Sequence, residues 1–188
     1  MRPRAGEVLH FSEDPTITVF APHVPVIAQQ TTPYVWAVDA AQAPSYWFPR
    51  ECPRAMAWVR DGSSAEDVAR VLGPGGGERV HAVEYGWLER IRTVELFAYR
   101  LPAATFEPVG ETWSHACVSR VTVRPLGPPE RVGDLFALHG AAGIQLRVLP
   151  HLHDFWDGVG ASTLAWSGIR PRNALPRPSG RADPPTSG

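Results

Sequence analysis

Short apolar runs separated by turn-forming residues dominate the chain, and they predict a fold rich in strands. We expect strands where apolar residues alternate or cluster over about four to eight positions. The first run ends at the turn formers Ser-Glu-Asp-Pro. Residues 21–33 contain three prolines and no periodicity, which predicts a long loop of the kind that often binds ligands. The predicted strands cover residues 8–11, 34–38, 55–60, 79–83, 94–101, 116–123, 144–149 and 162–166.

Helical patterns are short and lie between the predicted strands. Over residues 40–48 a short helix is expected, which Pro44 confines to about one turn on either side. Ser63 with Glu66 three positions later forms a capping box, which opens a helix that the stretch GPGGG ends. Two further short helices are predicted over residues 84–91 and 131–142.

These elements predict an α+β fold with mixed, mostly antiparallel strands and short peripheral helices. The chain has 188 residues, a length that suits one domain with a single core, and we place this domain at residues 1–170. The final segment, residues 171–188, is rich in proline and poor in apolar residues. Too little apolar surface is available there to offset the entropy of ordering, so a disordered tail is predicted.

The overall composition excludes several classes of partner. Apolar residues make up 44% and charged residues 20% of the chain, as in ordinary globular proteins. The formal net charge of −1 gives no broad field that would attract nucleic acid or an anionic membrane. Because the N-terminus MRPRAGEVLHF lacks the apolar core of a signal peptide, a cytoplasmic location is expected.

The types of reactive residue limit the chemistry further. All 18 basic residues are arginines, which excludes Schiff-base catalysis, pyridoxal-phosphate attachment and a P-loop, since each needs a lysine. The two cysteines, Cys52 and Cys117, are too few and too far apart for a disulfide scaffold or a paired-cysteine zinc site. We expect buried or incidental thiols. Cys52 would need a nearby histidine to act as a nucleophile.

Three segments taken together carry a functional signal: VLHFSED at 8–14, YVWAVDAAQAPSYW at 34–47 and HAVEYGWLERIRTVEL at 81–96. They resemble the three motifs of ADP-ribosyltransferases of the diphtheria-toxin and poly(ADP-ribose) polymerase type. In that family a histidine on a strand, two aromatic residues and a glutamate surround the nicotinamide riboside of NAD. The resemblance implies an ADP-ribosyltransferase-like fold, with NAD as substrate and no metal. It assigns these positions to His10, the small hydroxyl residue Ser12, the aromatic pair Trp36 and Tyr46, and the catalytic glutamate Glu84.

The reaction explains why these residue types are needed. Cleavage of the bond between nicotinamide and ribose develops positive charge on the sugar, which the carboxylate of Glu84 would stabilise. Trp36 and Tyr46 would stack on the flat nicotinamide, a contact worth about 1–3 kcal/mol if base stacking is a fair analogue. A neutral His10 would hydrogen-bond ribose hydroxyls. The reaction would transfer ADP-ribose to an acceptor that the sequence does not identify.

Arginines lie near position 50 and near the end of the predicted domain, and those near position 50 have two interpretations. Arg50 or Arg54 would bind a pyrophosphate through a bidentate guanidinium contact, or either would pair with Glu51. We assign Arg50 to the nucleotide. Arg170 and Arg172 lie just before the predicted tail, where a salt bridge at the end of a strand is expected.

A second resemblance concerns the whole chain. The stretches LHFSEDP, WAVD, FPRECP and SGIRPRNA look like those of an uncharacterised bacterial family of unknown function, over residues 8–174. This resemblance implies no activity. A non-catalytic binding module is therefore an alternative function, in which Phe11 and Trp36 fill the nicotinamide slot. Structural roles are also open, with the aromatic residues as core anchors and Glu84 as a carboxylate at a helix N-terminus.

The segment HLHD at 151–154 supplies a third alternative. His151 and His153 would face one side of a strand, and Asp154 would add an oxygen ligand for a divalent metal. A metal-dependent hydrolase would follow from such a site. The simpler interpretation of the segment is a solvated loop after Pro150.

Overall fold

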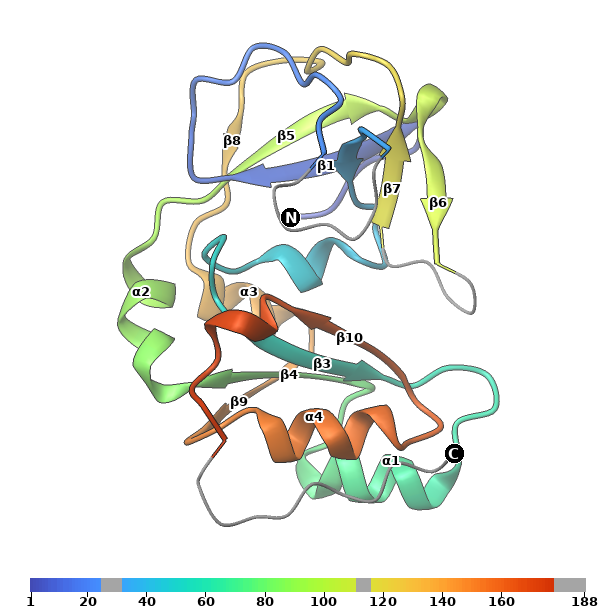
Figure 1. Cartoon of the computed structure of the whole chain (residues 1–188), viewed down its shortest axis with the longest axis vertical. Helices are drawn as coiled ribbons and strands as arrows, with labels where there is room; N and C mark the ends of the chain where they lie inside the picture. Colours follow the sequence, from blue (N-terminus) through green and yellow to red (C-terminus); the bar gives the residue numbers. More distant parts are fainter. Residues whose placement is uncertain (25–31, 111–115, 178–188) are drawn as a thin grey trace. The chain divides into compact units, whose positions relative to one another are not determined.

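The computed structural model of the chain describes residues 1–24, 32–110 and 116–177 (Figure 1). Their contacts divide the chain into two compact units. Unit 1 consists of residues 1–50 and 88–145, and unit 2 of residues 51–87 and 146–188. The predicted α+β class is confirmed: the strands are mostly antiparallel and the helices are short. Within the described ranges, no helix has both the length and the apolar character needed to cross a membrane.

Unit 1 contains two antiparallel three-stranded sheets (Figure 1). Strand β1 of the first sheet and β2 of the second are joined by two backbone hydrogen bonds of 2.8 Å between Leu9 and Val38. The first sheet has the order β1 (Glu7–Ser12), β5 (Phe97–Pro102), β8 (Glu130–Arg131), and the second the order β2 (Val35–Ala37), β7 (Ala116–Ser119), β6 (Glu107–Val109).

The core of unit 1 follows from the alternation of side chains along these strands. Val35 and Ala37 of β2 point into the core, so Trp36 between them belongs to the opposite face of the sheet. Tyr99 of β5 is buried in the same core. Its hydroxyl donates to the carbonyl of Asp14 at 2.7 Å and accepts from Ile17 at 3.1 Å, which fixes the segment after β1.

The helices of unit 1 are shorter than predicted. In place of the predicted helix at 40–48, a 3-10 helix, η1 (Ala43–Tyr46), begins where the Asp39 carboxylate accepts from the Gln42 amide at 2.8 Å. Helix α3 (Leu135–Ala141) begins four residues later than predicted, because the carboxylate of Asp134 accepts from two amides of its first turn and residues 130–131 form β8. The remaining helices are α2 (Leu88–Thr93) and the 3-10 helix η4 (Ala103–Thr105).

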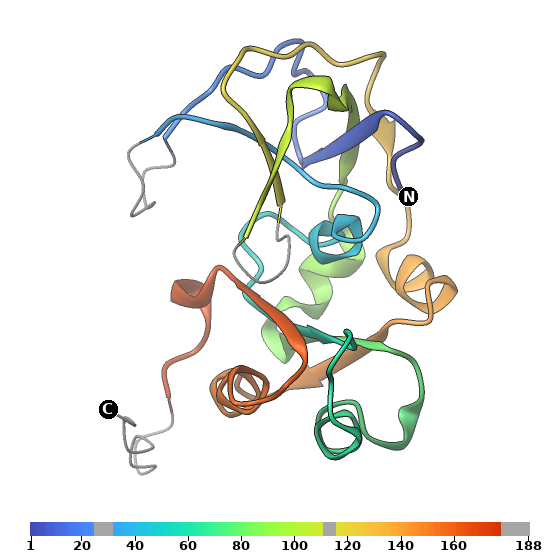
Figure 2. The same cartoon turned by 90° about the vertical axis from the view of Figure 1, so that its right-hand side faces the viewer.

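Unit 2 is a four-stranded sheet with two helices on one face (Figures 1 and 2). Ala57, Val80 and Leu164 from the sheet region pack with Val71 of α1 and Val159 of α4 in one apolar cluster. The sheet has the order β10 (Ala165–Ile169), β3 (Arg54–Trp58), β4 (Arg79–Glu84), β9 (Gln145–Leu149), and the helices are α1 (Ala65–Val71), α4 (His153–Gly160) and the 3-10 helices η2 (Gly73–Gly75), η3 (Tyr85–Trp87) and η5 (Pro171–Asn173).

Two predicted details differ from the structure. The residue that caps α1 is Ser64, whose hydroxyl accepts from the Asp67 amide at 3.1 Å, and not Ser63, whose hydroxyl accepts from the Arg60 amide at 3.0 Å. Strand β6, which has Pro108 at its centre, is not among the predicted strands. Proline is tolerated there because β6 lies at the edge of its sheet.

Part of the predicted tail is described, and its side chains contact other residues of unit 2. Arg172 and Arg170 both pair with Glu51, at 3.2 and 3.3 Å, so the predicted salt bridge at the end of a strand is confirmed. Arg177 pairs with Asp157 at 2.8 Å. Residues 178–188 lie outside the described residues, and the domain boundary at 170 stays a prediction.

Candidate functional site

His10 is the best defined of the predicted site residues. It lies on β1 with a half-buried ring whose centroid is 4.6 Å from that of Phe20. Its Nδ1 atom lies 2.7 Å from the carbonyl oxygen of Trp36. A carbonyl oxygen only accepts hydrogen bonds, so Nδ1 carries the hydrogen and, in the neutral ring, Nε2 carries the lone pair.

The surroundings of His10 keep the ring neutral. Burial lowers its pKa most strongly, and the positive charges of Arg50 and His23 lower it further, against the opposing effect of the Trp36 carbonyl. Since the ordinary pKa of histidine is about 6.5, the ring carries no charge at neutral pH. His10 therefore presents a hydrogen-bond acceptor, Nε2, rather than a cation.

The four aromatic residues between 34 and 47 have different environments. Trp47 is 2% exposed and packs edge-on against the ring of His139, with centroids 5.7 Å apart, so it is a core anchor. Trp36 and Tyr46 are half-buried. Trp36 packs edge-on against Tyr34 at 6.1 Å, and its indole Nε1 is buried with no hydrogen-bond partner among the described residues. The buried Trp47 is therefore the member of this aromatic group that is not available to a ligand.

Ser12 and Arg50 both contact the turn that follows β1 in unit 1. The Ser12 hydroxyl is buried and accepts from the Asp14 amide at 3.1 Å, which shapes the turn after β1. Glu13 in that turn accepts from the backbone amide of Arg50 at 2.9 Å and forms an ion pair with Arg90. The Arg50 side chain is exposed, and its guanidinium has no partner within the described part of the chain. The positive charge of Arg50 lowers the pKa of His10.

Glu84, the predicted catalytic carboxylate, ends β4 in unit 2 and is 2% exposed. Its Oε1 atom accepts from the amides of Leu152 at 3.2 Å and Leu175 at 3.1 Å. Its Oε2 atom also accepts from Leu175, at 3.1 Å. In the structure this carboxylate therefore holds the residue before α4 and the segment after η5 against the end of β4.

The other polar groups of unit 2 near Glu84 are also buried. Burial raises the pKa of Cys52 to about 12, with a small opposing effect of Arg54 and a further rise from Glu84. At neutral pH Cys52 is a thiol, which is a poor nucleophile. Arg54 is 2% exposed and donates to the carbonyl of Cys52 at 2.8 Å, so Arg50 is the exposed arginine of the two.

The HLHD segment does not form a strand. His153 begins α4, and its Nε2 atom lies 2.8 Å from the carbonyl oxygen of Leu175. His151 precedes the helix, and its buried Nδ1 has no partner among the described residues. Within the same residues, no group of three histidine, cysteine, aspartate or glutamate side chains is arranged to bind a metal ion.

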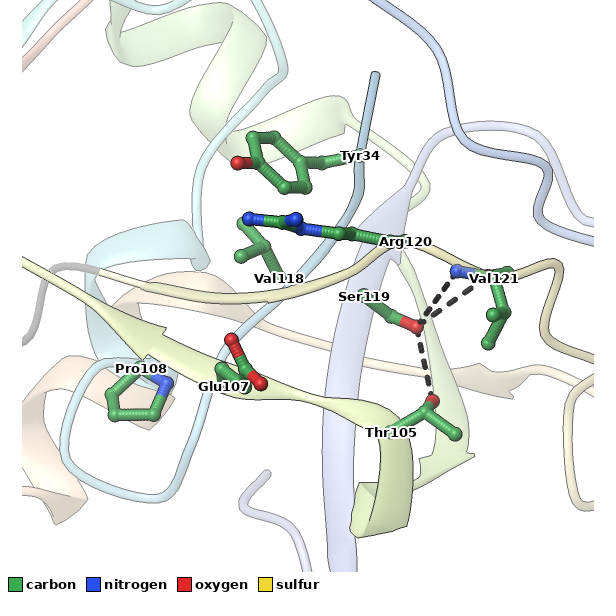
Figure 3. A pocket seen from close by; sticks show the side chains of 8 residues that line it. All are labelled: Tyr34, Thr105, Glu107, Pro108, Val118, Ser119, Arg120 and Val121. Carbon is green, nitrogen blue, oxygen red and sulfur yellow. Dashed lines mark hydrogen bonds between the residues drawn. The ribbon is translucent and has the colours of Figure 1, made fainter. Parts of the chain in front are cut away.

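A small pocket in unit 1 was not predicted from the sequence (Figure 3). It has a volume of about 180 Å³ and lies on the sheet formed by β2, β7 and β6. The predicted strands at 34–38 and 116–123 contain five of the lining residues, but β6 was missed and no motif marks Arg120. The residues that line it are Tyr34, Thr105, Glu107, Pro108, Val118, Ser119, Arg120 and Val121.

The comparisons with known proteins identify the family. A family model described as a family of unknown function (DUF6886) matches residues 9–174. The chain therefore belongs to this family, and the match agrees with the residues on which the second resemblance rests. No curated protein and no solved structure is significantly similar to the chain. A family without an assigned activity suggests no substrate, so any function has to be argued from the geometry.

Proposed function

We propose that this member of the DUF6886 family binds NAD through unit 1 and transfers ADP-ribose from it to an acceptor. The observation that supports the binding of NAD is the position of the hydrogen on the neutral ring of His10. Its Nδ1 hydrogen is used by the carbonyl of Trp36 at 2.7 Å, and its low pKa keeps the ring neutral. Nε2 is therefore fixed as an acceptor, which suits a ribose hydroxyl that donates.

The other residues of unit 1 supply the remaining contacts in this proposal. In this proposal the half-buried Trp36 and Tyr46 stack on nicotinamide. The unpaired guanidinium of Arg50 would bind the pyrophosphate. Ser12 contributes by holding the turn that follows β1, since its hydroxyl already accepts from Asp14.

The transfer step rests on the resemblance of the HAVEYGW segment to the glutamate motif. In that step the bond between C1′ of the ribose and nicotinamide breaks, and nicotinamide leaves with the electron pair. An acceptor nucleophile forms the new bond to C1′ and loses its proton. The resemblance assigns stabilisation of the positive charge that develops on the sugar to the carboxylate of Glu84, which is buried in unit 2 and accepts from the amides of Leu152 and Leu175.

Calorimetry with matched ligands tests the binding part. We expect His10→Phe to weaken binding of NAD, ADP-ribose and nicotinamide riboside by about tenfold each, because it keeps an aromatic ring but removes the acceptor, about 1.4 kcal/mol. Arg50→Gln should weaken NAD and ADP-ribose but not nicotinamide riboside, which has no pyrophosphate. Arg124→Gln removes an exposed charge elsewhere and is the control. No heat with any of the three ligands and folded wild-type protein would refute the proposal.

Release of nicotinamide from NAD tests the transfer. Wild type should release it, and folded Glu84→Gln should release none, with the assay run below the unfolding temperature of the variant. Equal rates for the two proteins would remove Glu84 from the reaction. Binding of NAD without any release by wild type would leave the non-catalytic binding module as the function.

A further inference from the structure

The pocket on the β2-β7-β6 sheet is formed by a different set of residues from the proposed nucleotide site. None of His10, Ser12, Trp36, Tyr46 and Arg50 lines it. Val118 is its apolar floor and lies opposite Glu107 of the edge strand β6 in the antiparallel register. Arg120 directly follows the end of β7 and also lines the pocket. Figure 3 shows the side chains of Arg120, Val118 and Glu107 around one space.

The two charged side chains of the pocket have opposite signs and are unpaired. Neither the guanidinium of Arg120 nor the carboxylate of Glu107 forms an ion pair or hydrogen bond with a described residue. The guanidinium carbon of Arg120 lies 5.8 Å from the centre of the Tyr34 ring, and Figure 3 shows the two groups one above the other. This cation–π contact holds Arg120 extended and lowers the entropy that a ligand has to remove on binding.

Two hydroxyl groups, those of Ser119 and Thr105, line the pocket away from the guanidinium of Arg120 (Figure 3). The buried Ser119 hydroxyl accepts from the Val121 amide at 3.3 Å and lies 3.0 Å from the hydroxyl of Thr105, to which it donates. Thr105 is exposed and keeps its own hydrogen for another acceptor. The pocket therefore offers the guanidinium of Arg120 for an anion and the carboxylate of Glu107 for a cation, beside the apolar side chain of Val118.

We propose that this pocket binds a free α-amino acid. The carboxylate of the ligand pairs with Arg120, and its ammonium group pairs with Glu107. An apolar side chain of the ligand lies on Val118 and Pro108. The volume of about 180 Å³ favours a ligand of this size, because sites for drug-sized molecules measure about 300–1,000 Å³.

Titration of the ¹⁵N-labelled full-length protein, followed by amide chemical shifts, tests the proposal. L-Leucine is the probe, L-leucinamide lacks the carboxylate, and 4-methylpentanoate lacks the ammonium group. We expect leucine to shift the amides of residues 118–121 and 105–107 with a dissociation constant on the order of 1 mM, because exposed ion pairs are weak. Each of the other two compounds should bind at least fivefold more weakly.

Three single variants separate the two charge contacts. Arg120→Gln should reduce the affinity for leucine to that for leucinamide, and Glu107→Gln should reduce it to that for 4-methylpentanoate. Arg124→Gln removes an exposed arginine that does not line the pocket and should bind leucine as wild type does. Equal affinity for the three compounds, no shift at these amides, or unchanged leucine binding by both pocket variants would each overturn the proposal. None of these measurements involves NAD, so the result is independent of the proposed function.

Discussion

The Nδ1 atom of His10 lies 2.7 Å from the carbonyl oxygen of Trp36, 26 positions away in the sequence. This contact joins the histidine motif and the aromatic motif on neighbouring strands of unit 1. It also determines which ring nitrogen carries the hydrogen, because the partner can only accept. The acceptor character of His10, on which the proposed binding of NAD depends, is thus a consequence of a backbone carbonyl rather than of another side chain.

The low pKa of His10 predicts a pH-dependent stability. In the unfolded chain the ring takes up a proton below about pH 6.5, while the folded protein resists protonation. The stabilising contribution is therefore complete above about pH 6.5 and is lost as the pH falls towards the lower pKa of the folded state, by at most about 1.4 kcal/mol per pH unit. Urea unfolding at several pH values should show a shallower decline in the free energy of unfolding for His10→Gln than for wild type.

His23→Gln is the matched control for this measurement, because His23 is exposed. Its free energy of unfolding should decline with falling pH almost as steeply as that of wild type. If His10→Gln and His23→Gln gave the same slope as wild type, His10 would not be the group that titrates.

The carboxylate of Glu84 is expected to contribute to the stability of unit 2. Glu84→Gln keeps one oxygen that accepts from Leu152 and Leu175, but it removes the negative charge and the second oxygen that accepts from Leu175. We expect a loss of about 1–2 kcal/mol in the free energy of unfolding, because hydrogen bonds to a charged acceptor contribute more than those to a neutral one. Amide hydrogen exchange at Leu175 should become faster. Glu78→Gln, at an exposed position of the same unit, should change the stability by less than about 0.5 kcal/mol. Equal unfolding free energies for the two variants would contradict the structural role of Glu84.

Gly168 of β10 is required by the position of Trp156. A Cβ atom at residue 168 would overlap the indole ring of Trp156, while the backbone of Gly168 lies outside the left-handed region. Gly168→Ala should therefore lower the free energy of unfolding by about 1–3 kcal/mol through overpacking. Gly86→Ala is the control in unit 2, because no atom lies within 4 Å of the added methyl group.

A second variant identifies the cause of this effect. In a double-mutant cycle, Trp156→Leu should recover at least about 1 kcal/mol of the loss that Gly168→Ala produces. Additive effects of the two substitutions would show that the indole is not the obstacle.

Local sequence patterns were sufficient where neighbouring residues determine the structure. The run from Val8 to Phe11 is apolar and ends at turn formers, and β1 forms there. The strand near Val35 and the helix near Leu135 follow from alternation and from a 3.6-residue period in the same way. Boundaries were less certain, because Ser63 and Ser64 are both suitable caps. In the structure Ser64 is the cap, and both Ser64 and Asp67 form hydrogen bonds with Thr163, almost a hundred positions away.

The environment of each site residue depended on partners that are distant in the sequence. Trp36 and Trp47 are equivalent by residue type, yet Trp47 is buried against His139 while Trp36 is half-buried on a sheet face. Glu84 accepts from Leu175, 91 positions later, a bond that no local pattern indicates. The sequence by itself determined the residue types, their order and the α+β class, because these follow from local propensity and periodicity. Only the tertiary structure decided which side chains are buried, which atoms accept hydrogen bonds, and that Arg120 and Glu107 line one pocket, because burial and pairing depend on contacts across strands.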